Sequence, residues 1–209
     1  MATLESMLAS PDQSIRLKAA LAAGTYPQLG FVEILISQCR HEPDFFVRDT
    51  LSWALMRQDR EAVMEMLIPE LTSPVAQARS QAVHTLSKIG DKKNYPLISK
   101  ELLLDHEDSV ASTAWRAASV LVPEEEKSAL VAVLVTQLGR GDSDTQFALT
   151  RFLCAIGDAI LEPLQEAAKS ENEAIRVQAE FTVMRYQEMK LESKRTVGGE
   201  GFEPPTSSV

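Results

Sequence analysis

Two His-Glu pairs, His41-Glu42 and His106-Glu107, are the residues of this sequence whose types could bind a catalytic metal. Imidazole and carboxylate are common metal ligands, but a metal centre usually needs three or more of them brought together. The chain has one other histidine, His84. We therefore expect both pairs to be ordinary residues of the turns between helices, and we expect neither a metal nor any other cofactor.

Other arrangements that support catalysis are missing from the sequence. It has no glycine-rich phosphate loop and no Ser-His-Asp or Cys-His arrangement. Cys39 and Cys154 lack the CxxC spacing of redox and metal sites. The acidic run Glu124-Glu125-Glu126 stands at a predicted helix start, where the helix dipole favours negative charge. We therefore predict that the protein is not an enzyme.

The overall composition predicts an all-helical protein. Hydrophobic residues make up 44% of the chain and aromatic residues 6%, alanine and leucine are frequent, and β-branched runs are rare. The net charge of −9 and the pI of about 4.9 do not favour binding to nucleic acid or to an anionic membrane. The sequence shows no signal-peptide pattern and no apolar stretch near the roughly 18 residues of a membrane span. We expect a cytosolic protein with reduced cysteines.

An internal repeat of about thirty residues organises the sequence. Its anchor positions, Ile15, Val47, Ala78, Val110, Thr145 and Ile175, are separated by 32, 31, 32, 35 and 30 residues. Small or apolar residues recur four and eight positions after the anchors, at Ala19, Leu51, Ala82, Ala114, Leu149 and Ala179 and at Ala23, Leu55, Leu86, Ala118, Leu153 and Val183. Residues four apart share one face of an α-helix, so these positions predict a buried stripe on the second helix of each unit. The amphipathic segments 31–39, 60–71, 95–104, 124–138 and 158–169 predict first helices.

This pattern resembles the HEAT-repeat family in its short, phycobilin-lyase-like form. Residues 69–91 and 145–158 carry nearly all of that family's pattern: a proline-bearing first helix, a capping Asp, Val-Arg, an Ala four residues on and an Ile-Gly-Asp ending. The resemblance implies an all-α, right-handed α-solenoid of about six two-helix repeats over residues 1–188. The remainder, 189–209, is rich in Gly and Pro near its end, and we predict a disordered C-terminal tail there.

Arginines and acids recur in register with the repeat. Arg16, Arg48, Arg79 and Arg176 follow their anchors, and Asp12, Asp44, Glu107 and Asp142 stand four positions before that site. We interpret them as a structural ladder, in which the acids cap helices and the arginines bridge neighbouring repeats, rather than as a row of ligand contacts. The two His-Glu pairs are also out of phase with the iron-binding pairs of a HEAT-repeat hydroxylase, which lie inside the second helix.

A second set of positions faces away from the predicted core. The residue six positions after each anchor is rotated by roughly 200° from the buried position two residues before it. Because second helices line the concave side of a HEAT solenoid, the resemblance implies that this column and its neighbours line a groove. We predict the following partner-binding residues there: Trp53, Met56, Arg57, His84, Lys88, Arg116, Arg151 and Phe181. Trp and Arg are among the residue types most enriched at binding hot spots. The alternative for Trp53 is packing against the neighbouring repeat.

These observations predict a non-enzymatic protein–protein interaction or scaffold module. We expect a monomer that binds an acidic, partly apolar protein segment on its concave groove, without nucleic acid or membrane. The segment EPDFFVRDTLSWAL also resembles HEAT modules that accompany MerR-type transcription regulators, which implies a role accessory to such a regulator. The alternatives are a HEAT-like DNA glycosylase, with Trp53, Asp49 and Arg116 in its site, and a phycobilin lyase.

Overall fold

The computed structural model describes residues 3–197, and within this range the chain is helical and has no β-strand. The α-helices are α1 (Leu4–Leu8), α2 (Gln13–Thr25), α3 (Phe31–Cys39), α4 (Phe45–Met56), α5 (Arg60–Glu70), α6 (Ala76–Ile89), α7 (Lys100–Leu103), α8 (Asp108–Leu121), α9 (Lys127–Leu134), α10 (Ser143–Ile156), α11 (Leu161–Ala167) and α12 (Glu173–Val197). The same range holds the short 3-10 helices η1 (Lys92–Leu97), η2 (Glu124–Glu126), η3 (Val135–Gln137) and η4 (Asp158–Ile160). The all-α class predicted from the composition is confirmed.

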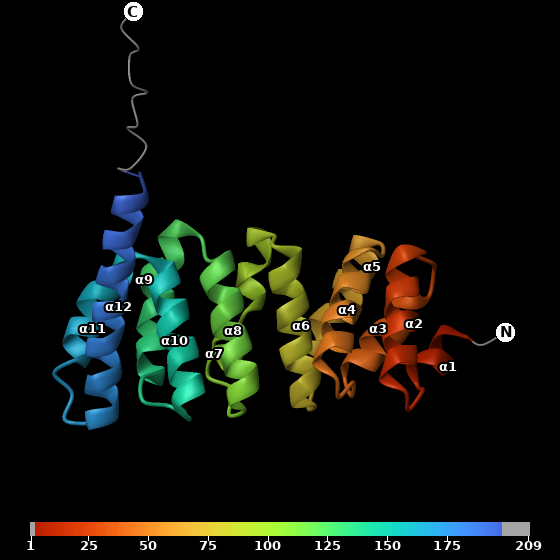
Figure 1. Ribbon diagram of the computed structural model, residues 1–209, viewed down its shortest axis with the longest axis horizontal. Helices are drawn as coiled ribbons and strands as arrows, with labels where there is room; N and C mark the ends of the chain where they lie inside the picture. The colour runs from red at the N-terminus through yellow and green to blue at the C-terminus, as the bar shows by residue number, and fades with distance from the viewer. Residues whose placement is uncertain (1–2, 198–209) are drawn as a thin grey trace, which may run out of the picture.

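The helices form two layers that follow the order of the chain. Each even-numbered helix from α2 to α12 packs against the next even-numbered one, and each odd-numbered helix packs against the even-numbered helix that follows it. Figure 1 shows the even-numbered helices side by side and roughly parallel to one another, each standing across the long axis of the molecule, in a row that follows that axis. We call the outer surface of α2, α4, α6, α8, α10 and α12 the second-helix face, since each is the second helix of its unit.

The stripe predicted four positions after the anchors forms the core between the layers. Its residues, Ala19, Leu51, Ala82, Ala114, Leu149 and Ala179, are at most 2% exposed. Full burial of one leucine side chain stabilises a fold by roughly 2 kcal/mol, so Leu51 and Leu149 help to fix the register of their helices. Among the anchors Ile15, on the first of the even-numbered helices, is exposed.

Glycine and proline set the ends of several helices. Gly90 ends α6 with φ of 70°, a left-handed conformation that suits glycine at a helix C-terminus. One helix was predicted over 95–104, whereas the structure has η1 followed by α7. Pro96 has no N–H to donate, and the Ser99 hydroxyl accepts a hydrogen bond from the backbone N–H three residues on, which starts α7 anew. The predicted helix 124–138 is likewise divided, into η2, α9 and η3.

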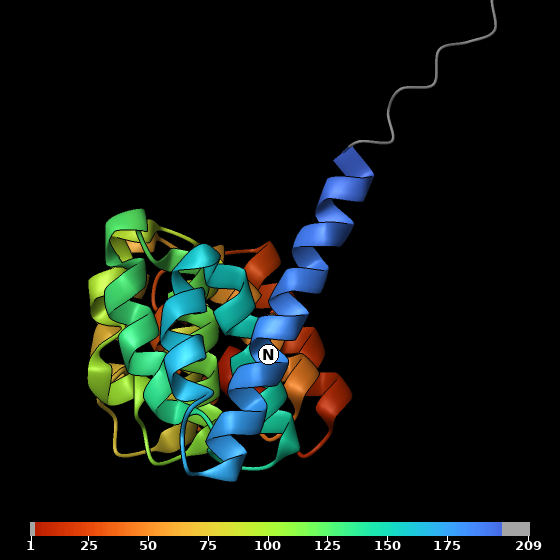
Figure 2. The ribbon, with the colours of Figure 1, turned by 90° about the vertical axis from the view of Figure 1, so that its left-hand side faces the viewer.

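Helix α12 runs past the boundary predicted at residue 188. It continues to Val197, and Figure 2 shows its C-terminal end standing clear of the other helices. Strong helix formers such as Glu, Lys and Leu occupy this stretch, so the helix extends beyond its packed part. Tyr186 and Lys190 both donate hydrogen bonds to the carboxylate of Asp158, over 2.8 and 2.6 Å. The tail predicted as disordered over 189–209 is thus helical up to residue 197, and the rest of it lies outside the described residues.

Candidate functional site

The eight residues predicted to bind a partner are all carried by helices of the second-helix face. Trp53 and Met56 lie in α4, Arg57 caps the C-terminal end of α4, His84 and Lys88 lie in α6, Arg116 in α8, Arg151 in α10 and Phe181 in α12. Met56, Arg57 and Arg151 are exposed, and the other five are half-buried. Because these helices pack in chain order, the residues follow one another along the layer. Their use in binding stays a prediction.

Trp53 is a packing residue as well as a surface residue. Its indole ring lies over Gly24 of the neighbouring helix α2, so closely that a Cβ atom added at Gly24 would stand 2.2 Å from Cζ3 of Trp53. The ring is half-buried and packs against the hydrophobic core. This contact is the inter-repeat packing that the sequence left open for Trp53. Part of the ring remains accessible at the surface.

Two of the predicted contacts, His84 and Lys88, are held by a carboxylate of the same layer. Lys88 Nζ donates to Asp49 Oδ1 over 2.5 Å, and His84 Nε2 is 3.3 Å from the same oxygen. The bond from Lys88 is the main cause that lowers the pKa of Asp49. Burial, and then the positive charges of Arg116 and Lys88, lower the pKa of His84, so its imidazole is neutral near pH 7. The polar groups of this cluster therefore largely satisfy one another.

Several arginines are bound to partners near the turns that precede the second helices. Arg16 donates to both carboxylate oxygens of Glu42, over 2.9 and 2.8 Å, and Glu42 is fully buried. Arg79 binds both oxygens of Asp105 in the same way, over 2.7 and 2.9 Å. Two-pronged pairs of this kind are stronger than single neutral hydrogen bonds. Each pair connects the second helix of one unit to a turn in the next.

The ladder of acids and arginines differs in its partners from the sequence prediction. Asp12, Asp44 and Asp142 do cap their helices, since each accepts a hydrogen bond from a backbone N–H of the first turn. The side chain of Glu107, predicted to do the same, makes no capping hydrogen bond at the start of α8. The bridging carboxylates, however, are Glu42 and Asp105, which the sequence did not assign. Each stands 26 residues after its arginine. This shared spacing is the signal that could have identified them.

Three arginine side chains have no hydrogen-bond or ion-pair partner of any kind among the described residues. Among the arginines whose side chains the structure describes, the guanidinium groups of Arg57, Arg116 and Arg151 make neither a hydrogen bond nor an ion pair with a described residue. All three are predicted partner-binding residues. The guanidinium carbon of Arg151 lies over the ring of Phe152, 4.8 Å from its centroid. This cation–π contact uses none of the N–H donors of the guanidinium group.

A hollow of about 220 Å³ lies between α4, α6 and α8 on the second-helix face, and we call it the polar hollow. It is lined by Phe45, Arg48, Asp49, Ser80, Gln81, His84, Ser109, Thr113 and Arg116. Arg48 donates to carbonyl oxygens of the turn before α4, and Asp49 is bound to Lys88. Arg116 is thus the cation lining this hollow that lacks a partner among the described residues.

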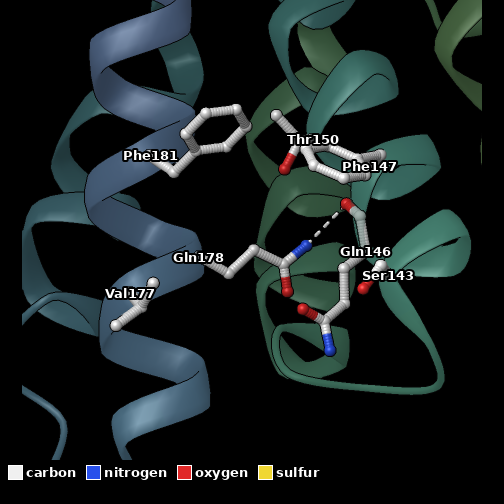
Figure 3. Close-up of a pocket in the computed structure, with 7 residues that line it drawn as sticks. All are labelled: Ser143, Gln146, Phe147, Thr150, Val177, Gln178 and Phe181. Atoms are coloured by element: carbon white, nitrogen blue, oxygen red, sulfur yellow. Dashed lines mark hydrogen bonds between the residues drawn. The ribbon is translucent and has the colours of Figure 1, made fainter.

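A second hollow, of about 230 Å³, lies between α10 and α12, and we call it the apolar hollow (Figure 3). It is lined by Ser143, Gln146, Phe147, Thr150, Val177, Gln178 and Phe181. The rings of Phe147 and Phe181 meet edge to face with their centroids 5.7 Å apart, and Phe147 and Val177 are more than half exposed. The side-chain amide of Gln178 donates to the carbonyl oxygen of Gln146 over 2.8 Å and accepts from a backbone N–H over 2.6 Å. The surface left for a ligand is therefore mainly apolar.

No family model matches the chain, and no curated protein is significantly similar to it. Between residues 3 and 197 no helix is both long and apolar enough to cross a membrane. In the same part of the chain no group of three or more His, Cys, Asp or Glu side chains could hold a metal ion. What the second-helix face offers is unpaired guanidinium groups beside apolar surface.

Proposed function

We propose that this chain is a non-enzymatic protein-binding module, built as a right-handed α-solenoid of about six HEAT-like repeats. The buried stripe and the two layers in chain order support this architecture. Packing among the even-numbered helices is continuous and more extensive than packing among the odd-numbered ones. That difference supports a row that curves with the second-helix face on its concave side.

The observation that carries the binding function is the location of the unpaired arginines. Arg116 and Arg151 lie well inside α8 and α10 and Arg57 caps the C-terminal end of α4, and none of the three has a hydrogen-bond or ion-pair partner among the described residues. Arg16 and Arg79 lie in the first turns of α2 and α6 and are bound by carboxylates. A guanidinium without an internal partner can form a two-pronged bond to a carboxylate of another protein. Arginines beside exposed aromatic residues are also typical of the residues that dominate binding energy at interfaces.

Charge and surface together indicate the kind of partner. The chain carries a net charge of −9, so most of its surface repels an acidic protein and does not favour DNA. The second-helix face departs from this average, because it combines arginines that lack partners among the described residues with the aromatic rings of the apolar hollow. A protein segment that is acidic and partly apolar complements such a face. We infer that this is the ligand class.

The test is an affinity pull-down with the full chain from a lysate of its native cells, followed by mass spectrometry. The variant Arg116→Glu, Arg151→Glu reverses the two free charges nearest the hollows. We expect at least one protein to be recovered with the wild-type chain and to be lost with this variant. Lost binding must be accompanied by an unchanged circular dichroism spectrum and melting temperature, because neither guanidinium group has a hydrogen-bond or ion-pair partner among the described residues.

A matched control changes the same net charge elsewhere. Lys92 and Lys93 are exposed residues of η1, outside the second-helix face. The variant Lys92→Glu, Lys93→Glu should recover the same proteins as the wild-type chain. If the two charge-reversed variants lose the same proteins, net charge rather than the second-helix face controls binding. If neither loses any, the binding surface lies elsewhere on the molecule.

A further inference from the structure

We propose that the ligand is an extended acidic segment of the partner that crosses α8, α10 and α12. It places carboxylates on Arg116 and Arg151 and an apolar side chain in the apolar hollow. This inference rests on the proposed function and specifies its ligand. The carboxylates and the apolar residue follow one another at intervals of about three residues.

The interval follows from the register of the repeat. Arg116, Arg151 and Phe181 each stand six positions after the anchor of their unit, on three successive second helices. Thr150 of α10 and Thr182 of α12 share a hydrogen bond of 2.9 Å, so these helices meet side by side at nearly equal positions of the repeat. Packed helices are about 8–10 Å apart, and an extended chain advances about 3.3 Å per residue. One step from helix to helix therefore takes about three residues.

The two arginines bind the acidic residues of the proposed ligand. Arg116 lines the polar hollow, where Asp49 is already bound by Lys88 and His84 is neutral, so its charge is left for a ligand. Arg151 is exposed on the next second helix, with its guanidinium carbon over the ring of Phe152 and its N–H groups not used by any described residue. A carboxylate bound to a guanidinium edge forms two parallel hydrogen bonds. A ligand with acids at this interval can form both pairs at once.

The apolar hollow binds the apolar side chain of the proposed ligand. Its volume of about 230 Å³ is smaller than the roughly 300–1,000 Å³ of pockets that enclose cofactors and drug-sized molecules, and it suits a single apolar side chain. The Thr150 hydroxyl and the Gln178 amide in its wall already have hydrogen-bond partners within the chain. Phe147 and Phe181 present ring surface that an apolar group would remove from water. Phe147 and Arg151 are four residues apart on α10, so the two kinds of contact adjoin.

The experiment selects ligands from a phage-displayed library of random 12-residue peptides on the full wild-type chain. Selected peptides are synthesised with a fluorophore, and their affinities are measured by fluorescence anisotropy. We expect a shared pattern of two acids and one large apolar residue at intervals of about three. Arg116→Glu and Phe147→Ala should each weaken such a peptide about tenfold or more. Inserting one residue between the second acid and the apolar residue should weaken it to a similar extent.

The outcomes separate this inference from the proposed function. Peptides that bind the second-helix face without the spaced pattern, or that are unaffected by Phe147→Ala, would overturn the inference and leave the proposed function standing. If no peptide prefers the wild-type chain to Arg116→Glu, Arg151→Glu, and the pull-down also finds no difference, both are overturned. Concentration-dependent dimerisation that Arg116→Glu abolishes would assign the face to a second copy instead. The Lys92→Glu, Lys93→Glu control should bind every selected peptide as the wild-type chain does.

Discussion

The arginines near the turns and the arginines of the second-helix face are the same residue type in opposite surroundings. Arg16 and Arg79 are each held by both oxygens of a carboxylate from the next unit. Arg116 and Arg151 have no hydrogen-bond partner among the described residues. The first pair joins unit to unit, and its hydrogen-bonding capacity is used within the chain. The second pair keeps its capacity for water or for another molecule. The comparison thus separates residues that hold the fold from residues that are available for recognition.

Removing a partner from the first group should have the largest effect. Glu42→Ala deletes the buried carboxylate that binds Arg16 and leaves the guanidinium in a mostly buried site without its charge partner. Such a loss costs about 3 kcal/mol or more, so urea-induced unfolding should show a decrease of that size in the free energy of unfolding. Glu107→Ala, in an exposed turn, is the matched control and should change it by less than about 0.5 kcal/mol. Equal, small changes in both variants would remove the distinction between the two groups.

The same pair makes stability depend on pH. Burial raises the pKa of Glu42, but hydrogen bonds from Arg16, from the backbone N–H of Asp44 and from Gln38 together hold it below its ordinary value. A carboxyl group whose pKa is lowered by folding adds stability above its unfolded-state pKa, and this contribution is lost as the pH falls through the folded-state value. We expect the melting temperature of the wild-type chain to fall below about pH 4.5. Glu42→Gln should be less stable at pH 7 and should lose less over that acid range. Parallel curves for the two proteins would contradict this account.

The helical framework is predictable because it depends on short-range periodicity. Residues four apart in one helix, such as Leu51 and Leu55, must share a face, and both are buried as predicted. The bridge from Arg16 to Glu42 spans two helices and a turn, so single-helix periodicity does not reveal it. Glu42 was expected to be an ordinary turn residue because its His-Glu pair falls in a turn between helices, out of phase with metal-binding pairs, and because the chain has only three histidines. Its burial follows from the packing of one unit on the next.

The sequence predicts which side chains of the candidate site face away from the core, but not the shape of the hollows that they line. Phe181 faces away from the core by helical periodicity, as predicted, but the hollow that it lines also needs α10 beside it. Trp53 was expected in a groove. Its ring packs closely against the neighbouring helix α2 because Gly24 on that helix has no side chain. This contact joins residues of two different helices, and the repeat spacing in the sequence does not show which side chains meet across helices. The free arginines were recognisable by type, whereas their lack of partners required the packed structure.

A substitution at Gly24 tests whether Trp53 belongs with the packed residues. Gly24→Ala would place Cβ 2.2 Å from Cζ3 of Trp53, so the ring must move. Overpacking costs about 1–3 kcal/mol, and the better helix propensity of alanine returns about 1 kcal/mol, so we expect a net loss of about 1 kcal/mol. The tryptophan emission should shift to longer wavelength as the ring becomes more exposed. In a Trp53→Ala background the same change at Gly24 should be neutral or stabilising. A loss of the same size in both backgrounds would show that Trp53 is not the cause.

The arginines of the second-helix face should contribute little to stability. Arg116→Ala and Arg151→Ala remove side chains without hydrogen-bond partners among the described residues, so each should change the free energy of unfolding by less than about 0.5 kcal/mol. Arg16→Ala is the comparison from the other group, and it should lose at least about 2 kcal/mol because Glu42 is left buried without its charge partner. Urea titrations of the three variants test this. A loss at Arg116 as large as that at Arg16 would mean that Arg116 has a structural partner.

The smallest expected effect is a change in the titration of His84, which lies on the second-helix face. Burial, then Arg116 of α8 and Lys88 of α6, lower the pKa of His84, and Asp49 of α4 offsets part of this. Since the folded-state pKa lies below that of the unfolded chain, His84 costs stability as the pH falls below about 6.5. Arg116→Ala removes one repulsive charge, so it should raise the pKa of His84 and reduce that cost. The measurement is the pH titration of the His84 ring proton by NMR. An unchanged titration in Arg116→Ala would mean that the guanidinium points away from His84, and Arg116 would then not present its charge in the polar hollow.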